Sequence, residues 1–149
     1  MKSHDYTATI LVDQTAEKAF AAIKNVRGWW SEDIEGSTDK VGDVFSYHYE
    51  DAHRCKMRLV ELVSNRKVTW LVTENHFNFT KDPNEWKGTR VVFEISRRDG
   101  KTQVRFTHKG LVPAFECYDV CSNAWGTYIT GSLRDLITKG KGQPNRKDR

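Results

Sequence analysis

Disulfide frameworks and long apolar runs are missing from this 149-residue sequence. Its three cysteines, Cys55, Cys117 and Cys121, are an odd number and lack framework spacing. We therefore expect reduced thiols and a cytoplasmic location, because disulfides persist in oxidising compartments. No apolar run approaches the ~20 residues that a membrane-spanning helix needs. The opening MKSHDYTATILVD lacks the continuous apolar stretch of a signal peptide, so neither membrane insertion nor secretion is expected.

Sequence motifs typical of catalytic sites are also missing. The sequence contains no Gly-x-Ser-x-Gly nucleophile motif and no phosphate-binding glycine loop. Asp51, His53 and Cys55 lie close together in the sequence, as do Cys117 and Cys121. Zinc needs three or four ligands in a tetrahedral arrangement, and neither cluster alone supplies that set. We therefore expect no metal and no cofactor, and we interpret the cysteines as buried free thiols that pack like small apolar residues.

The net charge of +4 is concentrated at the C-terminal end. Residues 139–149 contain five basic residues and one acidic residue, together with Gly140, Gly142 and Pro144. This composition predicts a basic flexible tail after a single domain at residues 1–138. No aromatic side chain alternates with these charges to stack on bases, so a nucleic-acid partner is not expected.

Hydrophobic periodicity predicts a strand, two short helices, five further strands and a long helix. Apolar residues alternate along the expected strands at 6–12, 44–50, 54–63, 68–74, 88–97 and 101–109. The expected short helices cover 16–25 and 26–30, and Asp13 and Thr15 can cap the first. The polar, glycine-containing segment 31–42 is interpreted as a loop. Over 114–138, apolar residues recur every three to four positions, which is typical of a helix that buries one face.

This order of elements predicts an α+β fold. The short turns, including Asp99-Gly100, allow neighbouring strands to pair as an antiparallel meander. A six-stranded sheet of this size curls, and its concave face is the surface large enough to cover the apolar stripe of the last helix.

Several segments resemble one known superfamily. They are the strand-to-helix segment ILVDQTAEKAFAAI at 10–23, the pair Trp29-Trp30, the segment GDVF at 42–45 and the terminal helix with Trp125. Over nearly the whole chain, they resemble the START-like helix-grip (SRPBCC) superfamily, and within it the AHSA-like branch, named after an activator of a heat-shock chaperone's ATPase. The resemblance implies a curved antiparallel sheet wrapped around a long C-terminal helix. It also implies a cavity under that helix, in which members bind lipids, hormones or polyketides, whereas other members bind proteins.

The resulting hypothesis is a binding domain for a small apolar or lipid-like molecule between sheet and helix. Such sites are mostly apolar with a few polar groups, although the same aromatic residues can equally fill a closed core. The predicted wall consists of Trp29, Trp30, Phe45, Tyr47, Met57, Trp70, Phe93, Phe106, Tyr118, Cys121 and Trp125.

Two other functions remain open at this point. A cyclase or hydrolase could use the same cavity, with Glu74 and His108 as the proton-transfer pair if burial moved their pKa values towards neutrality. A protein-interaction or chaperone-associated module could act through the outer face of the sheet or through the segment 75–87, where Phe77, Phe79 and Trp86 are expected to be exposed.

Overall fold

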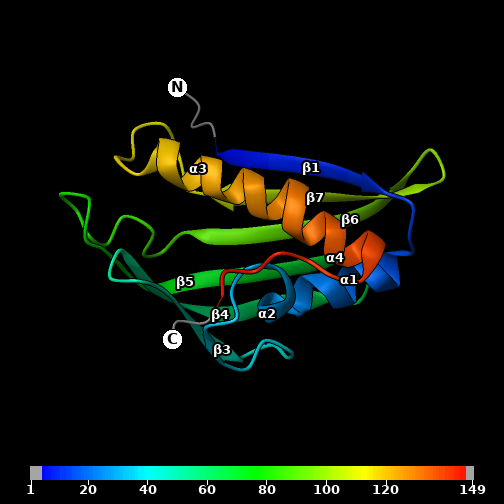
Figure 1. Ribbon diagram of the computed structural model, residues 1–149, viewed down its shortest axis with the longest axis horizontal. Coiled ribbons are helices and arrows are strands. Elements are labelled where there is room, and N and C mark those ends of the chain that lie inside the picture. The colour runs from blue at the N-terminus through cyan, green and yellow to red at the C-terminus, as the bar shows by residue number, and fades with distance from the viewer. Residues whose placement is uncertain (1–4, 147–149) are drawn as a thin grey trace.

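A seven-stranded antiparallel sheet is the base of the fold (Figure 1). The computed structural model describes residues 5–146. The strand order is β1-β7-β6-β5-β4-β3-β2, so every strand except the first pairs with a sequence neighbour. The strands are β1 (Tyr6–Val12), β2 (Ile34–Gly36), β3 (Val44–Tyr49), β4 (His53–Val63), β5 (Lys67–Phe77), β6 (Arg90–Arg98) and β7 (Lys101–Lys109).

The six predicted strands are present, and the Asp99-Gly100 turn joins β6 to β7 as expected. Both turn residues have positive φ, 53° and 78°. The prediction of six strands is wrong by one, because β2 lies within the segment interpreted as a loop. Only Ile34 of its three residues is buried, so no alternation marks it in the sequence. The Arg27 guanidinium holds β2 in place by donating to the carbonyls of Ile34 and Gly36 at 3.1 and 2.9 Å.

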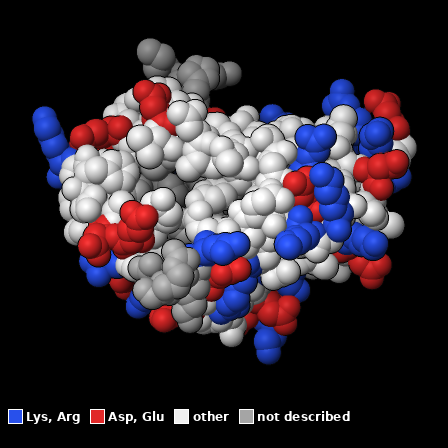
Figure 2. All heavy atoms as spheres, viewed as in Figure 1, with Lys and Arg blue, Asp and Glu red and all other residues white. Residues whose placement is uncertain are grey.

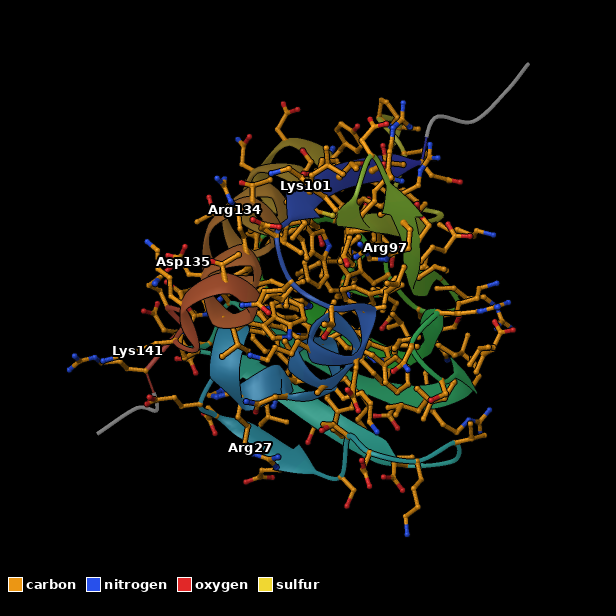
Figure 3. The ribbon with its side chains drawn as sticks, turned by 90° about the vertical axis from the view of Figure 1, so that its right-hand side faces the viewer. Arg27, Arg97, Lys101, Arg134, Asp135 and Lys141 are labelled. Atoms are coloured by element: carbon orange, nitrogen blue, oxygen red, sulfur yellow. The ribbon has the colours of Figure 1, made fainter. Side chains whose placement is uncertain are left out.

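All helices lie on one face of the sheet (Figure 1). Helix α1 (Ala16–Lys24) begins at the Thr15 cap, whose hydroxyl accepts from the Lys18 N–H at 3.1 Å. Helix α2 (Val26–Trp29) follows directly. Seen from the end, the sheet curves around the helices and side chains fill the space between them (Figure 3). Within residues 5–146, no helix is long and apolar enough to cross a membrane.

The C-terminal helix begins later than predicted. It consists of α3 (Tyr118–Thr127), a π-helical turn η1 (Tyr128–Leu133) and α4 (Arg134–Lys139). Residues 114–117 form turns instead, and the carboxylate of Glu85 accepts from the backbone N–H groups of Glu116 and Cys117 at 2.8 and 3.1 Å. This carboxylate satisfies N–H groups that a helix start leaves unpaired. It comes from a segment about thirty residues earlier in the sequence, so local pattern does not reveal it.

Aromatic rings fill the space between the sheet and the helices. Trp30 stacks on Tyr47 with ring centroids 4.1 Å apart and on Trp70 at 5.9 Å. Phe93 contacts Trp70 edge-on at 5.1 Å. Trp30, Trp70 and Phe93 are each at most 1% exposed. The middle of the domain is therefore a closed core.

Residues 140–146 form a C-terminal strap that lies along the helical face (Figure 1). Gly140 ends α4 in the left-handed conformation, which reverses the chain. The Gln143 N–H donates to Ser132 Oγ at 2.7 Å, and the Asn145 N–H donates to the carbonyl of Trp30 at 2.9 Å. Lys141 points outwards (Figure 3).

The strap differs from the flexible tail predicted for 139–149, since residues 140–145 are bound to the domain by backbone hydrogen bonds. Composition indicates flexibility, but it does not show which distant groups are available as partners. Residues 147–149 lie outside the described part of the chain.

We predict that Ser132→Ala destabilises the fold by about 1–3 kcal/mol, because its buried hydroxyl donates to the Trp29 carbonyl and accepts from Gln143. Urea unfolding measures this loss. Thr130→Ala is the matched control, because the exposed Thr130 hydroxyl bonds only to the carbonyl of Gly126 in the same helix. That control should stay within about 0.5 kcal/mol, and equal losses for both variants would show that the strap contact adds nothing.

Candidate ligand pocket

A pocket of about 260 Å³ opens between α3, the β3–β4 hairpin and the β5–β6 connection. On this side of the molecule, uncharged residues surround a recess left of the centre (Figure 2). The strap closes part of it, because Asn145 belongs to the wall. The wall consists of Trp30, Tyr47, Tyr49, Ala52, His53, Phe77, Phe79, Trp86, Val120, Cys121, Ala124, Trp125, Tyr128 and Asn145.

The structure divides the predicted wall residues into two groups. Four of them, Trp30, Tyr47, Cys121 and Trp125, line the pocket. The others do not line it, and apart from the partly exposed Tyr118 they belong to the closed core: Trp29, Phe45, Met57, Trp70, Phe93 and Phe106. Alternation shows which face of a strand is buried, but it does not show where along the sheet the packing leaves space.

The aromatic residues of the segment 75–87 are mostly buried, contrary to prediction. Phe77 and Trp86 are 2% and 4% exposed, and Phe79 is 41% exposed. The Phe77 N–H donates to the carbonyl of Pro83 at 2.9 Å, which folds the segment back over the sheet. Trp86 then stacks on Trp125 with centroids 5.7 Å apart. The sequence marks these wall residues by the number of aromatic residues in this segment. That composition is compatible with buried as well as exposed side chains.

The predicted proton-transfer pair is not formed. Lys56 pairs with Glu74 and Met57 with Val72, so Thr73 is an extra residue that reverses the alternation of β5. Glu74 consequently points outwards, with its side chain 68% exposed and 3.9 Å from Lys56 Nζ. His108 is fully buried, so these two groups cannot exchange a proton with a shared substrate.

His108 connects the long helix to the sheet. Its Nδ1 accepts from Trp125 Nε1 at 3.1 Å. Its Nε2 lies 2.8 Å from Thr89 Oγ1, whose own proton is donated to the carbonyl of Trp86. Nε2 is therefore the protonated nitrogen. Burial lowers the pKa of His108 to about 3, with a smaller effect from His53, so the ring is neutral near pH 7.

His53 is the histidine that reaches the pocket. It lies between aromatic rings, with centroids 4.3 Å from Phe77 and 4.6 Å from Trp86. Its Nε2 is 2.7 Å from Oδ1 of the buried Asn75. Burial lowers the pKa of His53 to about 4, although the hydrogen bond with Asn75 opposes this shift.

A second polar group lies where the strap meets the wall. The Asn145 side-chain amide donates to the hydroxyls of Tyr128 and Tyr47 at 2.6 and 3.3 Å. Burial, and secondarily the neighbouring Tyr128, raises the pKa of Tyr47 above its ordinary value. The Tyr47 hydroxyl is therefore a neutral hydrogen-bonding group.

The three cysteines are buried free thiols, as predicted. The hydrogen bond with Cys121, followed by burial, raises the pKa of the Cys117 thiol, and burial raises that of Cys55. Neither is therefore an activated thiolate at neutral pH. Among the described residues, no group of three or more His, Cys, Asp or Glu side chains is placed to hold a metal ion.

A larger hollow of about 610 Å³ lies on the opposite face of β3, β4 and β5. Its wall includes Asp33, His48, Arg54, Lys56 and Glu74, and it opens to solvent. An apolar ligand would gain little there, because charged groups would lose hydration on contact with it. The smaller pocket is the better candidate.

Comparison with known proteins agrees with this architecture. The profile of the family described as Activator of Hsp90 ATPase homolog 1-like protein matches residues 14–138. The chain belongs to this family. The predicted assignment to the AHSA-like branch of the helix-grip proteins is thereby confirmed.

Solved structures show the same fold. The Aha1 dimer from Colwellia psychrerythraea has a TM-score of 0.75 and 24% identity, covering 93% of this chain and 99% of that chain. DynU16, a protein in the dynemicin biosynthetic locus, has a TM-score of 0.68 and 9% identity over 98% of this chain and 52% of that one. A Staphylococcus saprophyticus protein has a TM-score of 0.65 and 17% identity over 95% and 97%. No curated protein matches the sequence significantly.

The two buried histidines predict that acid destabilises the domain. Their folded pKa values of about 4 (His53) and about 3 (His108) lie below the ordinary 6.5. As the pH falls, the histidines of the unfolded chain therefore take up protons before those of the folded protein do. The stability is fully present above the unfolded-state pKa of 6.5, and it is lost progressively as the pH falls towards the folded-state pKa values. From about pH 7.5 to about pH 5, we expect unfolding free energy to drop by about 2 kcal/mol per histidine. Urea titrations across this range measure the drop.

His108→Gln tests the assignment, because this variant should lose about half of the pH dependence carried by the two histidines. A variant whose stability falls with pH as steeply as that of the unaltered protein would mean that His108 does not titrate as argued.

Proposed function

We propose that the domain binds a small apolar or amphipathic molecule in the pocket beside α3. One observation carries the proposal: the aromatic and aliphatic wall encloses about 260 Å³ next to a core that is otherwise closed. Ligand sites of this kind are mostly apolar with a few placed polar groups. The resemblance to helix-grip proteins that bind ligands under the long helix supports the same location.

The pocket volume limits the ligand. Sites for drug-sized molecules typically span about 300–1,000 Å³. A pocket of about 260 Å³ therefore admits a molecule smaller than these, or one end of a longer molecule. The ligand class also follows from charge, since the described wall contains no Asp, Glu, Lys or Arg. A charged ligand would lose hydration there without gaining a partner.

A ring of exposed apolar residues surrounds the pocket. Tyr49, Phe79 and Val120 are 42%, 41% and 60% exposed, and each belongs to a different element of the wall. These residues offer exposed apolar surface to a molecule that enters the pocket. The same three residues support an alternative function, in which a partner protein inserts an apolar side chain into the pocket. With its reduced thiols, the domain is proposed to act in the cytoplasm.

Native mass spectrometry of the gently purified protein tests the proposal, together with NMR titration with small aromatic compounds. We expect either a retained mass that is lost on denaturation, or saturable amide shifts at the pocket wall. Ala124→Phe should abolish both, because Ala124 lines the pocket. Thr127→Phe is the control, because Thr127 is exposed on the same helix. Shifts that persist in Ala124→Phe, or that lie elsewhere, would contradict a ligand site in this pocket.

A further inference from the structure

The protonation of His53 is fixed by its neighbour Asn75. The Asn75 amide nitrogen donates to the carbonyl of Pro83 at 3.0 Å, which turns Oδ1 of the same side chain towards His53. Oδ1 can only accept, so His53 Nε2 must carry the proton that lies in this 2.7 Å contact. In the neutral ring, Nδ1 is then an unprotonated acceptor. The buried amide therefore fixes which nitrogen of the pocket histidine can receive a hydrogen bond.

Nδ1 of His53 is available to a ligand. Within residues 5–146, it forms no hydrogen bond, and it is not among the buried polar atoms that lack a partner. Solvent therefore reaches this nitrogen, and His53 belongs to the pocket wall. The Asn75 side chain contacts the other ring nitrogen, Nε2, so a ligand can bind Nδ1 without breaking that hydrogen bond.

Several other polar groups of the wall are sealed from solvent or already hydrogen-bonded within the fold. The Trp86 N–H is sealed from solvent and has no acceptor among the described residues. The Cys117 thiol lies near this indole, and sulfur is at most a weak acceptor for its N–H. Tyr47 and Tyr128 share the Asn145 amide and point their hydroxyls towards the strap contact. Nδ1 of His53 is thus an acceptor that a ligand can use without disturbing the fold.

We propose that the pocket selects uncharged aromatic molecules that carry one hydrogen-bond donor, as a phenol does, and that Nδ1 of His53 accepts this hydrogen bond. The inference rests on the proposed ligand-binding function and specifies its ligand class. The rings of Phe77, Trp86 and Trp125 supply faces and edges for the aromatic body. The uncharged wall excludes carboxylates and ammonium groups, so the polar contact must be a neutral one.

Three probes of similar size test this inference: phenol, which can donate, anisole, which can only accept, and toluene, which can do neither. NMR titration of the intact protein gives the Kd of each probe. Nitrogen-15 spectra of the histidine rings report the state of Nδ1 directly. We expect the His53 Nδ1 resonance to lie further upfield with phenol bound than with toluene or anisole bound, because phenol donates a hydrogen bond to that nitrogen and the other two probes cannot.

His53→Phe keeps a ring in the wall and removes the acceptor. It should weaken phenol binding about fivefold, as the loss of one neutral hydrogen bond does, and leave toluene binding within about twofold. His48→Phe is the matched control, because His48 lies on the outer face of β3 and contacts Asp33 at 3.3 Å. It should change no Kd. Because the nitrogen-15 measurement uses the unaltered protein, it decides the question even if His53→Phe fails to fold.

Each other result has a defined meaning. If the probes bind but phenol leaves the His53 Nδ1 resonance no further upfield than toluene does, or if His53→Phe weakens the binding of all three equally, the inference is overturned and the proposed function stands. If anisole binds best, the wall acts as a donor instead, which also overturns the inference. If none of the probes binds in the pocket, the inference and the proposed function fall together.

Discussion

Trp30 packs face to face against Tyr47 at 4.1 Å and against Trp70 at 5.9 Å, and it meets Trp125 of the long helix at 5.0 Å. This one side chain therefore joins the outer strands, the central sheet and the helix. Its carbonyl also accepts from the strap residue Asn145. Because close-packed interiors leave little free volume, the rings around Trp30 close the centre of the sheet, and the apolar pocket lies at the end near the β3–β4 hairpin and α3.

The position of the extra residue Thr73 decides the chemistry of that space. Its insertion in β5 turns Glu74 to solvent and turns Asn75 inwards. The Asn75 amide therefore points inwards in place of the Glu74 carboxylate, and it fixes which nitrogen of the neighbouring His53 carries the proton. A carboxylate in this apolar setting would need a charged partner to offset its lost hydration, whereas an amide needs only hydrogen bonds, which Pro83 and His53 supply. The result is a neutral pocket with a defined acceptor.

The C-terminal helix and the strap complete the enclosure through one π-helical turn. The turn η1 contains both Tyr128, which faces the pocket, and Ser132, which accepts from the strap at Gln143. A π turn holds one more residue than an α turn, and such turns are frequent at functional sites. Here the turn carries two residues that the strap contacts. Ser132 accepts from the Gln143 N–H, and Tyr128, in the pocket wall, accepts from the Asn145 amide. The pocket wall thus depends on residues 98 positions apart in the sequence, as in the Asn145–Tyr47 hydrogen bond.

Local pattern in the sequence by itself determined the strands, the two short helices and the approximate span of the long helix. Period-two and period-3.6 burial is a property of each segment alone, and the Asp99-Gly100 turn is specified by its own φ angles. Only the tertiary structure decided what depends on distant partners. These features are the strand β2 held by Arg27, the Glu85 cap of the long helix, the strap and the location of the pocket at one end. The physical reason is that free volume and hydrogen-bond partners are set by which segments meet in space, and a residue's neighbours in the chain do not encode that.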